Sequence, residues 1–273
     1  MAVQQQVSAP ERRLAAPPAR TVARWRSRPA EAVALVAICL QIGYPLTGGS
    51  VRDVLTVAVV VAFSVACLLH AGATRGPRVA VGALLATALP GFAVELVGVH
   101  TSIPFGGYRY TGGLGYQLLG VPIVVALAWT MLAWPAAIAA RRLVSGRMAR
   151  VALGAWALTA ADLFLDPQMV RAGYWHWQHA TPHLPGVPGV PLTNLAGWLL
   201  ASLAISACLQ RLLETADCGG HVPGDGLAVG LYLWLWAGWS VALAVFLGVP
   251  TAAAWGAAGM GTVAIPLALR ARR

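Results

Sequence analysis

The stretch D-L-F-L-D-P-Q-M-V-R-A-G-Y-W-H-W-Q-H-A-T-P-H-L-P-G-V-P-G-V-P-L-T-N-L-A-G-W, residues 162–198, joins two apolar segments of the chain. It holds two Asp, three His, three Trp, one Tyr, one Arg and one Asn, whereas the rest of the chain is mostly Ala, Val, Leu and Gly. A second, smaller concentration of polar and aromatic residues runs from Glu95 to Gln117. We expect these two stretches to face each other.

The composition around them is that of an integral membrane protein. Of the 273 residues, 58% are hydrophobic and only 10% are charged, against about 25% charged in a soluble domain, and the mean hydropathy is +0.70. Most apolar segments approach the roughly 20 residues that cross a hydrocarbon core about 30 Å thick. We therefore predict an all-α fold, a polytopic membrane helical bundle of about eight transmembrane helices, with seven as the alternative. The expected spans cover about 30–47, 54–70, 79–97, 118–140, 151–166, 193–213, 227–248 and 251–269.

The sequence predicts a disordered N-terminal arm followed by a transmembrane domain. Residues 1–28 are rich in Ala, Pro and Arg and have no apolar core, which predicts a disordered basic arm. No small-residue cleavage site closely follows a short apolar segment, so this arm does not have the pattern of a signal peptide. Residues 29–273 are expected to form a single transmembrane domain. Pro167 is expected to end the fifth span, because a proline disfavours helix for the residue before it.

The basic residues predict an orientation. All 19 are Arg, and they give a net charge of +10, but they cluster between apolar runs, which favours anionic lipid over nucleic acid as the partner. With eight spans and cytoplasmic termini, 16 Arg lie on the inner side and 3 on the outer side. The positive-inside rule describes this asymmetry, so we expect a multi-pass protein of the cell (plasma) membrane with both polar stretches at the outer face.

Three acidic residues in or near the spans are candidates for chemistry. A charge within the membrane costs at least about 2.5 to 3.5 kcal/mol, so Glu95, Asp162 and Asp166 need an explanation. Asp162 and Asp166 are four residues apart and share one face of a helix. Two such carboxylates tend not to ionise together, so one is expected to keep its proton and to serve as a general acid. The structural alternative is that the acids cap helices or pair with Arg109 and Arg171.

The aromatic residues have two interpretations. Scattered Trp are typical of an interfacial belt, and this is our expectation for Trp129, Trp134, Trp234, Trp236 and Trp239. The Y-W-H-W sequence at 174–177 differs because it lies in a polar loop. Aromatic faces beside an acid can stabilise a carbocation, an interaction worth about 2 kcal/mol or more when desolvated.

The His residues of the long loop invite a metal interpretation. His176, His179 and His183 have the spacing H-x2-H-x3-H, but the loop is interrupted by prolines and offers only one such group. Interfacial histidines that form hydrogen bonds are the simpler interpretation for His179 and His183. The chain has no phosphate-binding or dinucleotide-binding motif. We therefore expect no metal and no cofactor, and chemistry that acids, aromatic side chains and water perform.

At these residues the chain resembles the membrane carotenoid-biosynthesis proteins that include the γ-carotene and bisanhydrobacterioruberin hydratases. The resemblance rests on three blocks, 95–122, 162–177 and 189–198, and it covers most of the chain after the basic arm. The loop before the last block is longer than the family pattern. The family's P-F-G-x-Y-x-Y and D-x-x-x-D-P cores are matched by Pro104, Phe105, Gly106, Tyr108, Tyr110, Asp162, Asp166 and Pro167.

The resemblance implies a carotenoid 1,2-hydratase, a hydro-lyase that adds water across the terminal C1–C2 double bond of a ψ-end-group carotenoid. One of the three acids would protonate C2, a second carboxylate would orient or deprotonate water, and aromatic rings would shelter the tertiary cation. The carotenoid would enter from the bilayer, and lipid and other carotenoid-pathway enzymes are the expected partners. The catalytic candidates are Asp162, Asp166 and Glu95, and the substrate-binding candidates are Tyr108, Tyr110, Phe105, Tyr174, Trp175, His176, Trp177, Asn194 and Trp198.

Three other functions stay open at this stage. A transporter would line its pathway with acids, although these acids lie at segment ends and no inverted repeat is visible. A metal-dependent carotenoid oxygenase would use the His cluster. A non-catalytic scaffold in a carotenoid assembly would need neither.

Overall fold

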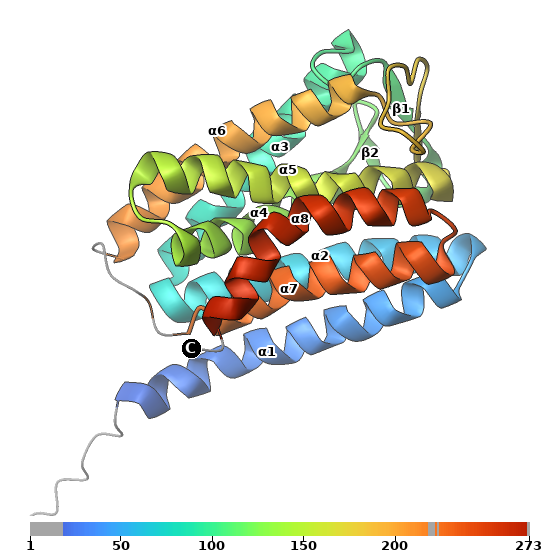
Figure 1. The fold of residues 1–273 in the computed structure, drawn as a ribbon. Coiled ribbons are helices and arrows are strands. Elements are labelled where there is room, and N and C mark those ends of the chain that lie inside the picture. Colours follow the sequence, from blue (N-terminus) through green and yellow to red (C-terminus); the bar gives the residue numbers. More distant parts are fainter. Residues whose placement is uncertain (1–18, 218–221, 223, 272–273) are drawn as a thin grey trace, which may run out of the picture.

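The structure is a computed structural model that describes residues 19–217, 222 and 224–271, with side chains from residue 28 onward. Within these residues, eight helices are long and apolar enough to cross a membrane (Figure 1). This confirms the prediction of an all-α polytopic bundle with eight spans. The helices are α1 (Ala19–Gly43) continued by η1 (Tyr44–Leu46), α2 (Gly49–Arg75), α3 (Pro77–Thr101), α4 (Ile123–Leu143), α5 (Arg147–Ala172), α6 (Leu192–Asp217), α7 (Gly226–Val241) continued by the π-helix η3 (Ala242–Phe246), and α8 (Pro250–Ala271).

The ends of the described chain lie at one end of the bundle. The start of α1 and the end of α8 are on the same side in Figure 1, as an even number of spans requires. The cytoplasmic location of this side stays a prediction from the arginine distribution. α1 begins at Ala19, so residues 19–28, which we expected in the disordered arm, are helical. Residues 1–18 of that arm lie outside the described residues.

The fifth span is longer than the sequence rule for proline suggests. α5 continues through Pro167 to Ala172, so our expectation that it ends at Asp166 is wrong. Proline is tolerated inside transmembrane helices where neighbouring elements satisfy the freed backbone groups, and α5 packs against α4, α6 and α8. The helix ends instead at Gly173, whose φ of 80° is left-handed and whose N–H bonds back to the last turn. Asp162 and Asp166 therefore lie inside the helix.

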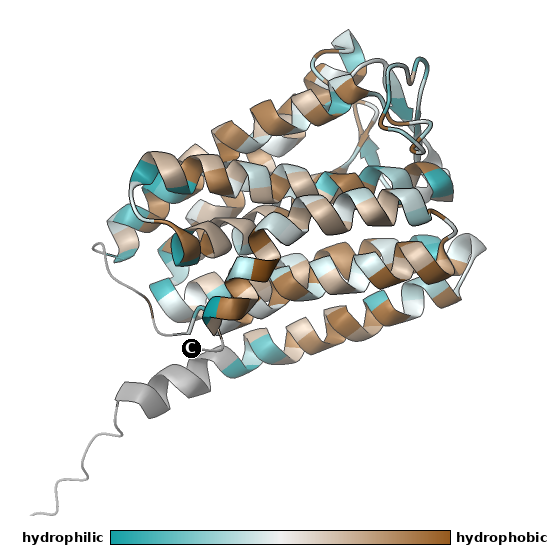
Figure 2. Cartoon of the chain, in the orientation of Figure 1, coloured by the Kyte–Doolittle hydropathy of each residue, from teal (hydrophilic) through white to brown (hydrophobic). Residues whose placement is uncertain are grey.

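The centre of the bundle is α4. Every residue from Trp129 to Ala140 is buried, because α4 packs against α2, α3, α5, α6, α7 and α8. The outer helices instead present apolar side chains such as Leu89 and Leu200 on their outward faces. Figure 2 shows hydrophobic residues along these helices and hydrophilic residues near their ends and in the loops. This distribution suits a protein surrounded by hydrocarbon.

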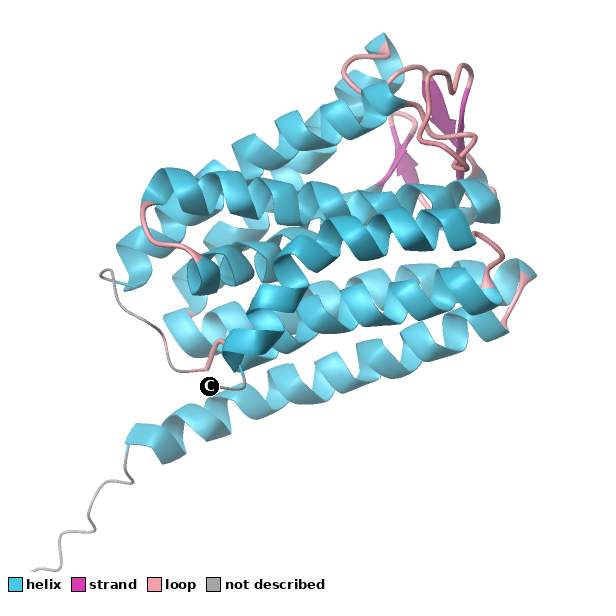
Figure 3. Ribbon diagram, viewed as in Figure 1, coloured by secondary structure: helices cyan, strands magenta, loops and turns pink. Residues whose placement is uncertain are grey.

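Two short antiparallel strand pairs lie at the end of the bundle opposite the C-terminus (Figure 3). β1 (Tyr108–Tyr110) pairs with β4 (Trp175–Trp177), with Tyr108 opposite Trp177 and Tyr110 opposite Trp175. β2 (Gln117–Leu118) pairs with β3 (Val121–Pro122) next to the short helix η2 (Gly112–Leu114). The β1–β4 pair joins the two polar stretches of the sequence and confirms that they face each other.

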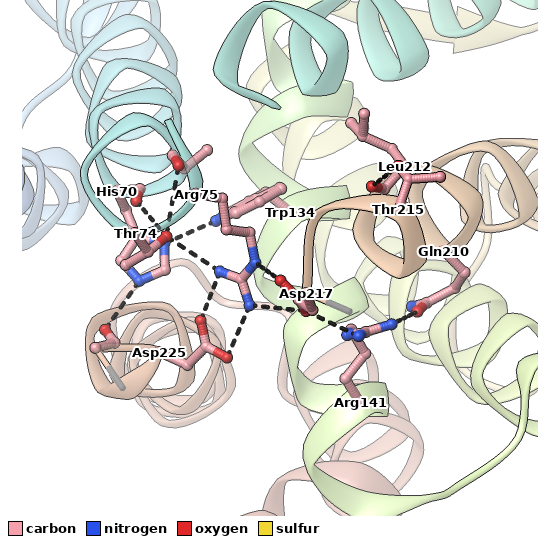
Figure 4. Close-up of polar contacts among 12 residues, drawn as sticks. His70, Thr74, Arg75, Trp134, Arg141, Gln210, Leu212, Thr215, Asp217 and Asp225 are labelled. Atoms are coloured by element: carbon pink, nitrogen blue, oxygen red, sulfur yellow. Dashed lines mark hydrogen bonds and ion pairs between the residues drawn. The ribbon is translucent and has the colours of Figure 1, made fainter. Parts of the chain in front are cut away.

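A buried ion-pair cluster closes the opposite end of the bundle (Figure 4). Arg75 of α2 lies between Asp217 at the end of α6 and Asp225 just before α7, with N···O distances of 2.7 Å to each. Asp217 also pairs with Arg141 of α4 at 2.8 Å. The side chains of Arg75 and Asp217 are only 1% exposed. The cluster therefore holds both ends of the α6–α7 link against α2 and α4.

Replacing Asp217 by Ala is expected to lower the free energy of unfolding by about 3–5 kcal/mol, because the change removes a shared partner from two buried arginines. The matched control is Glu214→Ala, since Glu214 forms a partly exposed pair with Arg147 at 3.7 Å that is worth about 0–1 kcal/mol. Thermal unfolding of the detergent-solubilised variants measures both effects. Equal midpoint shifts in the two variants would contradict a stabilising role for the cluster.

Candidate active site

Glu95 is the first element of the site. It lies on α3 and is 5% exposed. Its carboxylate accepts hydrogen bonds from the hydroxyls of Tyr108 and Tyr110, the latter at 2.7 Å, and from the indole N–H of Trp129 at 3.3 Å. Burial, and then the negative charge of Glu95, raise the pKa of Tyr108 and of Tyr110. Both hydroxyls therefore keep their protons and donate.

A glycine three residues after Glu95 on α3 lets the tyrosines approach Glu95. Gly98 follows one turn later, on the same face, and a Cβ at this position would lie 2.8 Å from the Phe105 ring and 3.0 Å from the Tyr108 hydroxyl. The absence of a side chain at Gly98 lets Phe105 and Tyr108 pack directly on the helix. The loop after α3 can then fold back and place β1 above Glu95.

Asp162 and Asp166 form the second element. They lie one turn apart on α5, and both are at most 3% exposed. The amide of Asn194, in the first turn of α6, donates to Oδ2 of Asp162 at 2.9 Å and to Oδ2 of Asp166. Oδ1 of Asp162 is buried and has no hydrogen-bond partner among the described residues. One amide thus bridges two carboxyl groups.

A cavity of about 70 Å³ brings the two elements together. Thr56, Glu95, Asp166 and Asn194 are polar residues of its lining, and most of the remaining wall is aromatic or aliphatic. Trp129 and Trp198 are stacked in this wall with ring centroids 4.3 Å apart. We call this cavity the acid pocket. Its aromatic side chains are Phe105, Tyr108, Tyr110, Trp129, Trp175, Trp177 and Trp198.

Three sequence candidates lie outside the acid pocket. Asp162 is behind Asn194 and lines a separate cavity of about 20 Å³. His176 is exposed on the outer side of β4, where its Nε2 accepts a hydrogen bond from Arg109 at 2.8 Å. Tyr174 is buried, but its hydroxyl bonds to Thr56 at 2.9 Å, and burial raises the pKa of Tyr174 to about 12.

The His residues of the long loop do not come together as ligands. Among the described residues, no group of three His, Cys, Asp or Glu side chains has an arrangement that could hold a metal ion. His176 bonds to Arg109, and Nδ1 of His183 is 2.9 Å from the carbonyl of Leu184. The spacing H-x2-H-x3-H therefore does not become a three-His site in the folded chain.

Sequence reasoning missed Trp129. We expected Trp129 and Trp134 in an interfacial belt, but both are 1% exposed and both donate inside the bundle, Trp129 to Glu95 and Trp134 to His70. The belt interpretation is wrong for these two because α4 is central and has no lipid-facing side along this stretch. The available signal was the acid on a neighbouring span, since a buried carboxylate needs donors.

The fold and the site define a multi-pass membrane protein with a pocket of acidic and aromatic side chains at one end of its bundle. The chain belongs to the carotenoid biosynthesis protein family, whose model matches residues 52–264. It is 36% identical over 166 residues to a bisanhydrobacterioruberin hydratase from Haloarcula japonica. This match covers 56% of the chain and 54% of the relative, so it spans about half the length of that protein. No solved structure matches the chain.

The close packing at Gly98 is testable. Gly98→Ala is expected to push Phe105 and Tyr108 away from Glu95 and to lower the thermal midpoint, because the new methyl group has no room. The control is Gly230→Ala on α7, where an added Cβ has nothing within 4 Å and a helical Ala is favoured over Gly by roughly 0.5–1 kcal/mol. The midpoint of the control should stay level or rise. A Gly98→Ala protein as stable as the control would contradict the packing argument.

Proposed function

We propose that the chain is a carotenoid hydratase of the hydro-lyase class. It adds water across the terminal C1–C2 double bond of a ψ-end-group carotenoid and forms a 1-hydroxy carotenoid. The observation that carries this proposal is the acid pocket, where Asp166 and Glu95 share one aromatic cavity inside a membrane bundle. Membership of the carotenoid biosynthesis family and the similarity to a hydratase support it.

Asp166 is the proton donor in this proposal, because it is the Asp of the α5 pair that lines the acid pocket. Two carboxyl groups that share a buried site tend to ionise one at a time, so Asp162 and Asp166 hold one proton between them under the Asn194 amide. Transfer of this proton to C2 leaves the positive charge on the tertiary C1. Water then bonds to C1, and its released proton returns to the Asp pair. The net change is the addition of one water.

Glu95 has a different role. Hydrogen bonds from three donors, Tyr108, Tyr110 and Trp129, stabilise the ionised form of its carboxylate, and in this proposal Glu95 is the ionised group and not the proton donor. A fixed negative charge beside the pocket stabilises the cation that forms at C1. The faces of neighbouring rings such as Trp175 and Trp177 add cation–π stabilisation of about 2 kcal/mol in a desolvated site.

Product analysis in lycopene-producing cells tests these roles. The parent chain should yield products with the mass of one or two added waters. Asp166→Asn should reduce hydration by about 10²–10⁴-fold, the usual contribution of a positioned general acid. Asp162→Asn and Glu95→Gln should also reduce it, while the control Glu214→Gln, at the opposite end of the bundle, should match the parent. An Asp166→Asn chain as active as the parent would rule out Asp166 as the donor.

Isotope labelling separates hydration from oxygenation. In H₂¹⁸O the product hydroxyl should carry ¹⁸O, and in D₂O one deuterium should appear at C2, because water supplies both the hydroxyl on C1 and the hydrogen on C2. Under ¹⁸O₂ in ordinary water the product should stay unlabelled. Incorporation of ¹⁸O from O₂ would support the metal-dependent oxygenase in place of the hydratase.

A further inference from the structure

A second and larger cavity lies beside the acid pocket. Its volume is about 430 Å³, and it is bounded by α1, η1, α2, α4, α5, α7 and the π-helix η3. Its lining is almost entirely apolar, with Gln41, Thr56 and Gln168 among the few polar side chains. We call it the apolar chamber. Single-turn π-helices occur often at functional sites, and η3 forms part of this wall.

The apolar chamber and the acid pocket share a wall. Five residues line both cavities, and they come from α2, α4 and α5. Two of the five are Met131 and Met169, whose unbranched side chains adapt their shape more easily than branched ones. Single side chains therefore contribute to both cavities, and the two Met are the most adaptable of them. The residues of the shared wall are Thr56, Val60, Met131, Leu165 and Met169.

The apolar chamber also reaches the lipid-facing surface. Four of its lining residues are more than half exposed: Ile42 on α1, Leu46 on η1, Val241 on α7 and Phe246 on η3. In a membrane, these apolar side chains face hydrocarbon. They mark a lateral mouth between the ends of α1 and α7, at the same end of the bundle as β1 and β4 (Figure 1).

We infer that the apolar chamber binds the long isoprenoid chain of the substrate and admits it from the lipid, so that only the chain end enters the acid pocket. This inference rests on the proposed function. The acid pocket, about 70 Å³, has room for a chain end but not for a polyene. The chamber is within the roughly 300–1,000 Å³ usual for ligand sites, so it holds part of the chain while the remainder extends through the mouth into the bilayer.

Filling the chamber tests the inference. Ala237→Phe adds a ring at an exposed residue that lines the chamber and not the acid pocket. Its control is Ala258→Phe, an exposed position on α8 that lines neither cavity. Leu46→Trp narrows the mouth at a side chain 67% exposed, and its control is Leu200→Trp, 61% exposed on α6. Leu46 and Leu200 are both largely exposed, so a larger apolar side chain at either position is compatible with folding.

Two measurements are made on each variant. The first is hydration of lycopene, which should fall about tenfold or more in Ala237→Phe and Leu46→Trp and stay at the parent level in the two controls. The second is the carotenoid that co-purifies with each variant in an Asp166→Asn background. Pigment should be retained with Asp166→Asn alone and with the controls, and lost when the chamber is filled or its mouth is narrowed.

The outcomes separate this inference from the proposed function. If the parent hydrates lycopene and the filled variants hydrate and retain it equally well, the chamber is not the chain site, while the hydratase proposal stands. If the parent hydrates nothing but pigment is lost only from the filled variants, the hydratase proposal fails, while the chamber still binds the isoprenoid chain. Loss of pigment from the controls as well would overturn the chamber assignment.

Discussion

A carboxylate inside a hydrocarbon layer has to be solvated by the protein, and this requirement organises the functional end of the bundle. Glu95 satisfies it with Tyr108, Tyr110 and Trp129, which draws β1 and the central helix α4 to α3. The Asn194 amide does the same for the α5 acids and fixes the start of α6 against α5. The β1–β4 pair then closes over both arrangements. Desolvation cost, more than strand or loop propensity, selects this geometry.

Buried acidic side chains have different partners at the two ends of the bundle. At one end, Asp217 and Asp225 are neutralised by buried arginines, and such a cluster links helices. At the other end, the ion pairs of the described residues do not include Glu95 or either α5 acid, whose partners are hydroxyl, indole and amide donors. An acid held by neutral donors is not paired with a cation, so it stays available to a ligand. The arginine pairing that we considered for these acids therefore occurs, but for different acids at the opposite end.

The number and approximate positions of the spans can be predicted from the sequence, because the length of each apolar segment and the arginines beside it are local features. The sequence also predicts that the two polar stretches face each other, because successive spans run in opposite directions and both stretches connect spans at the same end of the bundle. What failed depends on packing between segments. Pro167 stays helical because neighbouring helices support α5, Trp129 is buried because α4 is central, and β4 turns His176 outward while it turns Trp175 and Trp177 inward. These features depend on contacts between distant segments, which the pattern of residues along the chain does not specify.

The proposed reaction places two opposing demands on the position of the acid pocket. A carotenoid is soluble only in hydrocarbon, whereas the water that it would receive comes from the aqueous phase. At the centre of the bundle, water would be scarce, and in an exposed loop, water would lower the electrostatic benefit of Glu95 by raising the local dielectric constant. The acid pocket lies near one end of the bundle, where residues of β1 and β4 line it and the apolar chamber adjoins it. Continuing α5 through Pro167 serves the same end, because it keeps both Asp residues within a rigid helix at this depth.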